Sequence, residues 1–373
     1  MISRRSALSL AALPGLPAPP PAAEDEYPEH AARYLKRLYA PAGQRLAFRE
    51  DYPGGFRNWQ REARAGLRLK LGLEKIAASV GNHQPAVELG EAADMGEYTR
   101  QRGTIETEPG VRIPFWLLKP KGKGPRPLGI FSHGHDARGH DTTAGVYSGK
   151  AHEERSLAED RDVAVQAARL GFIAVAPASR GLAAWVIPDL RDRHGKQSCR
   201  SHVMHCLLAG RTAMGERVWD MQRILDWAVT LPEADRRRVL MMGNSGGGMV
   251  TIFAAACDQR ITVAVPSCSF APTVSASGYV FHCDCNMVPG LMELGGLPNV
   301  AGLIAPRWLL SVSGRRDALF SNEAIESAAG QVRGIYRAAG HAGRYEHRWG
   351  GAGHRFYKDL MWPFIGPALR LDR

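Results

Sequence analysis

The segment 243–247, GNSGG, fits the G-x-S-x-G pattern that presents a nucleophilic serine in a sharp turn. Such a serine attacks a carbonyl carbon once a neighbouring base has taken its proton. The letters alone are weak evidence, because a Gly-rich turn with an ordinary serine has the same composition. Their position is stronger evidence, since the apolar run 239–242 predicts a strand before the motif and 252–256 a helix after it. We therefore expect Ser245 to be a nucleophile at a helix N-terminus.

The base and the acid that activate such a serine are expected further along the chain. Asp317 follows the strand-like run 308–312, and His354 follows the run 345–349. Functional loops of open parallel sheets gather past the carboxyl ends of strands, where both residues lie. We predict that His354 takes the proton from Ser245 and that Asp317 orients the imidazole.

Rival residues are less well placed. His347 would lie inside a strand and His341 before one, and His282 is the third rival histidine. Among the acids, Asp258 comes too soon after the helix that follows the serine, and Asp359 falls in the final helix.

A negative charge that develops on the substrate oxygen needs backbone N–H donors. One expected donor is the N–H of Gly246, and the other is the N–H of His135 in the loop 132–136, SHGHD, after an earlier strand. His133 and His135 could instead be metal ligands, but no matching carboxylate or histidine spacing supports this.

Four further residues are candidates for substrate binding. They lie in the same loops or beside the motif: His133, Arg180, Asn244 and His282. Arg180 follows a strand end, and for this residue a structural role in holding its loop is the favoured alternative.

The elements that must position these residues alternate along the chain. Apolar strand runs at 128–132, 172–176, 239–242, 261–265, 308–312 and 345–349 are interspersed with helical runs such as 162–170 and 211–230. This order predicts an α/β fold with a mainly parallel sheet flanked by helices. Residues 97–119 alternate as strands do and predict a hairpin with its turn at 108–110.

The chain divides into three parts. Residues 1–25 contain the pair Arg4-Arg5 before a short apolar run, which predicts a twin-arginine export signal or, alternatively, a disordered tail. An export signal would place the protein in the periplasm or outside the cell. If the segment is instead a tail, the protein would be cytoplasmic. Residues 26–96 are expected to form an N-terminal helical extension, and 97–373 the catalytic domain.

Composition excludes several classes. The 373 residues are 45% hydrophobic and 23% charged, as in an ordinary globular protein. The net charge of +11 comes from scattered residues, whereas nucleic-acid binders gather their charge on one face. No stretch approaches the roughly 20 apolar residues that span a bilayer.

The six cysteines leave three interpretations open. They are Cys199, Cys206, Cys257, Cys268, Cys283 and Cys285. Together with His202, His205 and His282 they suggest zinc, but their spacings are poor and no C-x-x-C pair exists. A disulfide within the set is the second interpretation, and a structural loop near the site is the favoured one. No metal and no cofactor are therefore expected.

Taken together, the motifs resemble the acetyl xylan esterase and dienelactone hydrolase branch of the α/β-hydrolases. The resemblance extends from about Tyr34 to the C-terminus. It rests on the segments 105–111, 133–135, 210–212 with 215–220, 243–248, 282–286 with 289–290, 313–314 with 316–317, and 353–356. It implies the α/β-hydrolase fold, the triad Ser245, Asp317 and His354, and hydrolysis of carboxylic esters without a cofactor. A serine peptidase of the prolyl oligopeptidase kind is the alternative enzyme, and a binding protein on an inactive hydrolase scaffold is the third hypothesis.

Overall fold

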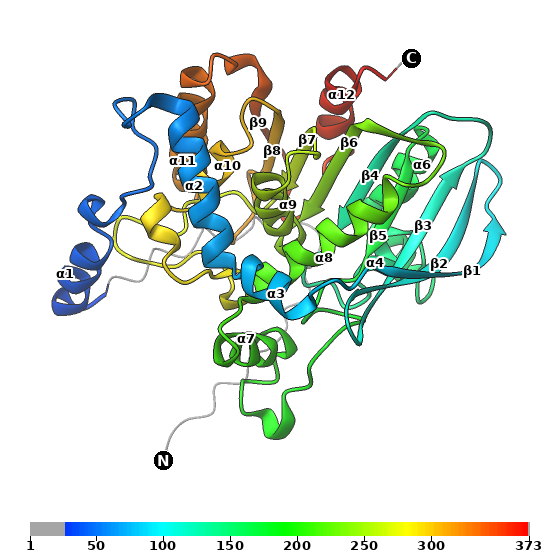
Figure 1. Ribbon diagram of the computed structural model, residues 1–373, viewed down its shortest axis with the longest axis horizontal. Helices are drawn as coiled ribbons and strands as arrows, with labels where there is room; N and C mark the ends of the chain where they lie inside the picture. The colour runs from blue at the N-terminus through cyan, green and yellow to red at the C-terminus, as the bar shows by residue number, and fades with distance from the viewer. Residues whose placement is uncertain (1–26, 372–373) are drawn as a thin grey trace.

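The computed structural model describes residues 27–371, and within them the strands form one nine-stranded sheet (Figure 1). The strand order is β1-β2-β3-β5-β4-β6-β7-β8-β9. The pairs from β1 to β3 and the pair β3·β5 are antiparallel, and the pairs from β5 through β4 to β9 are parallel. The strands are β1 Ala86–Asp94, β2 Tyr98–Glu108, β3 Val111–Pro120, β4 Arg126–Ser132, β5 Ile173–Pro177, β6 Ala234–Asn244, β7 Val263–Ser267, β8 Trp308–Gly314 and β9 Tyr345–Gly350.

Helices cover both faces of this sheet (Figure 1). The α-helices are α1 Glu29–Leu38, α2 Gly55–Leu71, α3 Leu73–Val80, α4 His140–Thr143, α5 Lys150–Ala158, α6 Val163–Arg169, α7 Ser198–Leu208, α8 Ala213–Ala228, α9 Gly246–Cys257, α10 Leu297–Gly302, α11 Asn322–Ala338 and α12 Lys358–Leu369. Short 3-10 helices are η1 Pro41–Gly43, η2 Leu190–Asp192, η3 Asp284–Asn286, η4 Leu291–Leu294 and η5 Ala342–Arg344.

Successive residues of the central strands enter two different cores, as the two-residue period of a strand requires. In β6, Val239 and Met241 join the larger core with α2, α8, α9 and α11, while Leu240 and Met242 face α6 and α12. The fold class predicted from the alternating runs is therefore confirmed, and so is the hairpin, in which β2 and β3 pair across the turn near Gly110.

The N-terminal extension packs into the larger core. Trp59 of α2 is fully buried, and its Nε1 donates a hydrogen bond of 2.9 Å to the carbonyl of Leu46. Leu67 and Leu71 follow on the same face at helical spacing and are buried as well. Helix α1, in contrast, contains no buried residue.

One boundary needs correction. The range 26–96 was expected to form an N-terminal helical extension; its helices end at Val80, and Ala86–Asp94 forms the edge strand β1. Most of β1 is exposed, so it lacks the alternation that identifies a half-buried strand, and its three acidic residues suit an open edge. The predicted export signal at 1–25 lies outside the described residues. Among the helices that the structure does describe, none is long and apolar enough to cross a membrane.

Candidate active site

Ser245 stands at the junction of β6 and α9 in a strained backbone conformation. Its φ of 56° and ψ of −125° lie where non-glycine residues are rarely found. Its N–H donates to the carbonyl of Ser267 in the neighbouring strand at 2.9 Å, which helps to hold the turn. The strand and helix expected on either side of the motif are both present.

The glycines of the motif are required by close backbone approach. A Cβ at Gly243 would lie 2.3 Å from the carbonyl of Gly247, and a Cβ at Gly247 would lie 2.1 Å from the carbonyl oxygen of Ser132. Any side chain at either position would therefore push β4 away from the turn.

Asp317 and His354 meet although they come from different loops. Asp317 follows β8, His354 follows β9, and the Oδ2 of Asp317 accepts a hydrogen bond of 2.7 Å from the Nδ1 of His354. The carboxylate is buried, and its Oδ1 accepts a second bond from the N–H of Leu319 at 3.1 Å. Because Nδ1 is engaged, Nε2 of the imidazole is the nitrogen left to exchange a proton.

A cavity of about 390 Å³ joins these groups. Ser245, Gly246, His135 and His354 all line it, and His282 lies on its wall. Among the described residues, no hydrogen bond links Ser245 to His354. Such contacts are often long in a hydrolase without substrate and tighten when the substrate binds.

The loop after β4 runs against the serine. A Cβ at Gly134 would come within 2.9 Å of the Cβ of Ser245 and 3.1 Å of the nitrogen of Gly246. The backbone on either side of Gly134 therefore borders the space where a substrate oxygen would sit, as the proposed donors Gly246 and His135 require.

Two of the four candidate substrate-binding residues lie elsewhere. His133 is buried: its Nε2 accepts a hydrogen bond of 3.0 Å from the N–H of Ser179, and its Nδ1 lies 2.8 Å from the carbonyl of Gly134. Arg180 is buried in an ion-pair network, so the structural alternative holds for it. Asn244 borders the cavity, with its side chain bound to the carbonyl of Ser267 at 3.2 Å.

His282 borders the cavity with an unused nitrogen. Burial lowers the pKa of its imidazole to about 4, although contacts with the backbone of Ala271 and Pro272 oppose this shift. Its Nε2 is buried and has no hydrogen-bond partner among the described residues, so a small rotation of the ring would be needed to turn it toward a substrate. A neutral imidazole of this kind can accept a hydrogen bond from a substrate hydroxyl.

Because His133 is buried, we predict that acid lowers the free energy of unfolding. Burial lowers the pKa of His133 to about 4, against about 6.5 in an unfolded chain. Between these two values the unfolded chain binds a proton that the folded chain does not, so the free energy of unfolding falls as the pH falls. We expect His133 to contribute up to about 1.4 kcal/mol per pH unit to this slope.

Urea unfolding measured from pH 7.5 to pH 4.5 tests this. The His133→Gln variant should show a shallower pH dependence than the unmodified protein. His30→Gln, which replaces an exposed histidine of α1, is the matched control and should leave the slope unchanged. An unaltered slope in His133→Gln would contradict the prediction.

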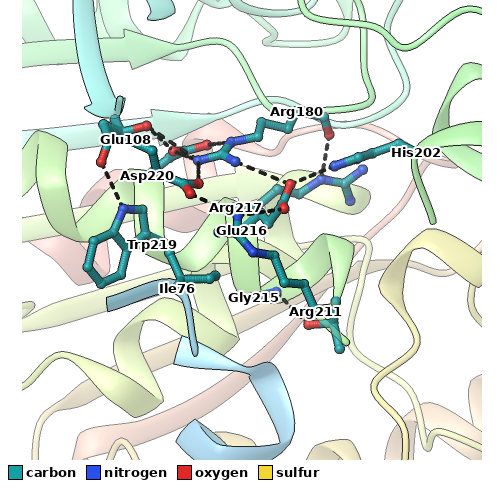
Figure 2. A network of polar contacts seen from close by, with 12 residues as sticks. Ile76, Glu108, Arg180, His202, Arg211, Gly215, Glu216, Arg217, Trp219 and Asp220 are labelled. Carbon is teal, nitrogen blue, oxygen red and sulfur yellow. Dashed lines mark hydrogen bonds and ion pairs between the residues drawn. The ribbon is translucent and has the colours of Figure 1, made fainter. Parts of the chain in front are cut away.

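Arg180 lies at the centre of a buried network of charged residues (Figure 2). Its guanidinium is 2.6 Å from a carboxylate oxygen of Asp220, 2.6 Å from Glu108 and 3.2 Å from Glu216. The side chain of Arg217 extends the network by donating from Nε to the carbonyl of Arg180 at 2.9 Å. This network ties the loop after β5 to the strand β2 and the helix α8, and none of its members lines the cavity.

Arg161 is a cavity residue that sequence analysis missed. It lines the cavity, and its Nη2 donates to the carbonyl of His354 at 3.4 Å, while its Nη1 lies 3.8 Å from Asp136. The apolar residues Met249, Phe281 and Phe320 line the same cavity. No motif marks Arg161, because the contact joins positions 193 residues apart.

Three of the six cysteines converge with His135 next to the cavity. His135, Cys199, Cys283 and Cys285 each offer one atom that could bind a metal, and these atoms all lie within 4.8 Å of one another. The spacing argument does not apply to this group, because the four residues come from three separate segments. All six cysteines are free thiols in this structure.

Comparison with known proteins agrees with this architecture. Residues 104–274 match the acetyl xylan esterase family (AXE1), a range that contains Ser245 and ends before Asp317 and His354. The YtaP protein of Bacillus subtilis (strain 168) is 25% identical over 248 residues, which are 65% of this chain and 78% of that protein.

Solved structures share the fold. The methylesterase BT1017 superposes with a TM-score of 0.64 at 21% identity, covering 92% of this chain and 68% of the other. A glucuronoyl esterase from Solibacter usitatus superposes with a TM-score of 0.59 at 15% identity, covering 87% and 96%. Residues 104–274 therefore match the family that the motifs resemble. The solved structures show the α/β-hydrolase fold.

Proposed function

We propose that the protein hydrolyses acyl esters of carbohydrates through an acyl-enzyme on Ser245, because residues 104–274 match the acetyl xylan esterase family. The observation that carries the proposal is the Asp317–His354 hydrogen bond of 2.7 Å at the wall of the cavity that Ser245 lines. A buried carboxylate, an oriented imidazole and a serine at a strained turn are the parts that nucleophilic acyl transfer needs.

The proposed reaction has two halves. Nε2 of His354 takes the proton of Ser245 as its Oγ attacks the ester carbonyl. The tetrahedral intermediate carries its negative charge on the former carbonyl oxygen, where the N–H groups of Gly246 and His135 would stabilise it. The bond to the alkoxy group then breaks, and His354 returns the proton to the leaving alcohol. Water repeats the sequence on the acyl-enzyme, releasing the acid and the free serine.

The cavity suits a small acyl group on a polar molecule. Met249, Phe281 and Phe320 give it an apolar part that would accept a short acyl chain, whereas Arg161 and His282 give it hydrogen-bonding groups. At about 390 Å³ it lies near the lower end of small-molecule sites, which run from roughly 300 to 1,000 Å³. We therefore favour acetyl esters over long acyl chains.

A substrate panel tests the proposal. We expect p-nitrophenyl acetate and acetylated xylan to be hydrolysed, p-nitrophenyl octanoate to be hydrolysed at least about tenfold less efficiently than the acetate, and a peptide p-nitroanilide not to be hydrolysed. A methyl ester of glucuronic acid belongs in the panel, because two structural neighbours are named methylesterase and glucuronoyl esterase. Preference for this ester would overturn the acetyl assignment, and cleavage of the anilide would favour the peptidase.

The same panel tests the part assigned to His282. His282→Phe should raise KM for acetylated xylan severalfold and leave KM for p-nitrophenyl acetate, which has no sugar hydroxyl, within about twofold, because one hydrogen bond is worth roughly 1 kcal/mol. The matched control is His30→Phe on the exposed face of α1. Equal changes for both substrates would remove His282 from the binding site.

A further inference from the structure

A cluster of three thiols and one imidazole lies next to the cavity and has no part in the reaction proposed above. His135 belongs to the loop after β4, Cys199 to the first turn of α7, and Cys283 and Cys285 to the two sides of the first residue of η3. We refer to these four residues as the Cys3His cluster. Cys199 and Cys285 are buried, Cys283 is half-buried and His135 is exposed, and the last two line the cavity.

The distances within the cluster match the edges of a tetrahedron around a metal ion. With Zn–S bonds of about 2.3 Å and Zn–N bonds of about 2.0–2.1 Å, tetrahedral geometry places a nitrogen about 3.6 Å from each sulfur. The Nε2 of His135 lies 3.4 Å from the Sγ of Cys285 and 3.7 Å from the Sγ of Cys283. All the ligand atoms, including the Sγ of Cys199, lie within 4.8 Å of one another, so small side-chain shifts would complete the shell.

We propose that His135, Cys199, Cys283 and Cys285 bind one zinc ion in a closed, four-coordinate structural site. Thiolate and imidazole are the ligands that Zn²⁺ takes in such sites, and Cys₃His is one of its common ligand sets. The four protein ligands fill the shell and leave no position for substrate. Binding releases the protons of the three thiols.

The surroundings compensate the charge that results. Three thiolates and one Zn²⁺ carry a net charge of −1, and a buried charge needs a partner. The fully buried Arg217 supplies one: its Nη1 lies 3.4 Å from both the Sγ and the carbonyl oxygen of Cys285. A second guanidinium, that of Arg200, pairs at 2.5 Å with Asp284, the residue between the two cysteines.

A disulfide fits the cluster less well. It would use two of the three sulfurs and would not account for the third thiol and the imidazole, which lie in the same group. Zinc, in contrast, uses all four side chains. The neighbouring group of His202, Cys206 and Glu216 is a weaker candidate, because His202 already pairs with Glu216 at 2.8 Å within the ion-pair network.

The zinc ion would position the oxyanion loop. The ring of His135 is a ligand, and the backbone N–H of the same residue is the proposed second oxyanion donor, so the ion would fix that loop to α7 and η3. This consequence rests on the proposed function, whereas the presence of the ion does not. Loss of the ion should therefore lower kcat far more than it raises KM.

Metal analysis of the purified full chain tests the site. We expect about one zinc per chain by inductively coupled plasma mass spectrometry. Cys199→Ser should lose nearly all of it, because Cys199 is a ligand outside the cavity lining. The matched control is Cys206→Ser, a buried cysteine on the same helix, which should retain its zinc. Circular dichroism verifies that both variants fold.

A second measurement keeps the test decisive where Cys199→Ser fails to fold. The unmodified protein is stripped of metal with a chelator under reducing conditions and then given Co²⁺, whose thiolate complexes absorb strongly in the near ultraviolet. Appearance of this band with about one bound Co²⁺ per chain supports the site. A protein with no zinc, no cobalt band, or a disulfide between two of the cluster cysteines in peptide mapping overturns it.

Kinetics separate the ion from the proposed reaction. In the stripped protein, kcat for p-nitrophenyl acetate should fall at least about tenfold and recover when zinc is restored, because one oxyanion donor is worth about 10²–10³ in kcat. If the purified protein contains zinc but its kcat does not change when the zinc is removed, the zinc site stands and only its role in positioning the oxyanion loop is overturned. Failure of the proposed function would instead appear as absence of ester hydrolysis in the zinc-loaded protein.

Discussion

Ser245→Ala should lower kcat/KM for p-nitrophenyl acetate by at least about 10⁴-fold, the largest effect expected of any single change in this protein. Alanine removes the only atom that can form the acyl-enzyme at the turn, while His354 and Asp317 remain in place. A fluorophosphonate probe should label the unmodified protein, and the variant should not be labelled.

Ser269→Ala is the matched control for this experiment, because Ser269 lines the same cavity but lies outside the turn. This variant should still be labelled. Labelling that persists in Ser245→Ala and disappears in Ser269→Ala would show that Ser269, and not Ser245, is the nucleophile.

Arg180→Met should have the largest effect on stability. The change leaves the carboxylates of Glu108, Glu216 and Asp220 buried without their shared cation. Burial lowers the pKa of Arg180, but these carboxylates raise it by more, so the side chain is held in its charged form. Removing one partner of a buried ion pair costs about 3–5 kcal/mol, and we expect at least this loss in the free energy of unfolding.

Denaturant unfolding measures this loss, and two further variants define its cause. Arg112→Met breaks an exposed pair with Glu88 and should cost less than about 1 kcal/mol. Arg180→Met combined with Asp220→Asn should recover part of the stability, because within residues 27–371 Asp220 pairs with Arg180 alone, whereas Glu108 and Glu216 also pair with Arg211. Equal losses of unfolding free energy in Arg180→Met and Arg112→Met would show that the buried network stabilises the fold no more than an exposed ion pair does.

The sequence was sufficient to predict the central sheet and to place Asp317 and His354 at one edge of it. Buried parallel strands are continuous apolar runs, as in Val239–Met242, and the residues that follow them must lie along one edge of the sheet. Asp317 and His354 were placed together by this rule, and the structure joins them by a hydrogen bond.

What the sequence did not predict depends on contacts between distant segments. The edge strand β1 is exposed and shows no apolar alternation. The Cys3His cluster joins His135 to residues 148 and 150 positions away, so none of its spacings resembles a zinc motif. The ion-pair network around Arg180 likewise assembles charges from β2, α8 and the loop after β5, and each looks like a surface residue when taken alone.

The packing of α2 has a consequence for the order in which the protein is made. The side chain of Arg64 hydrogen-bonds to the carbonyl of Leu303, 239 residues later, and Gln60 reaches the carbonyl of Ala305. During synthesis the apolar face of α2 therefore leaves the ribosome long before the surface that covers it exists. Exposed apolar segments of this kind make nascent chains prone to association. Co-translational folding cannot finish this domain until its final third has emerged, and a chaperone that shelters α2 until then should increase the yield of soluble protein.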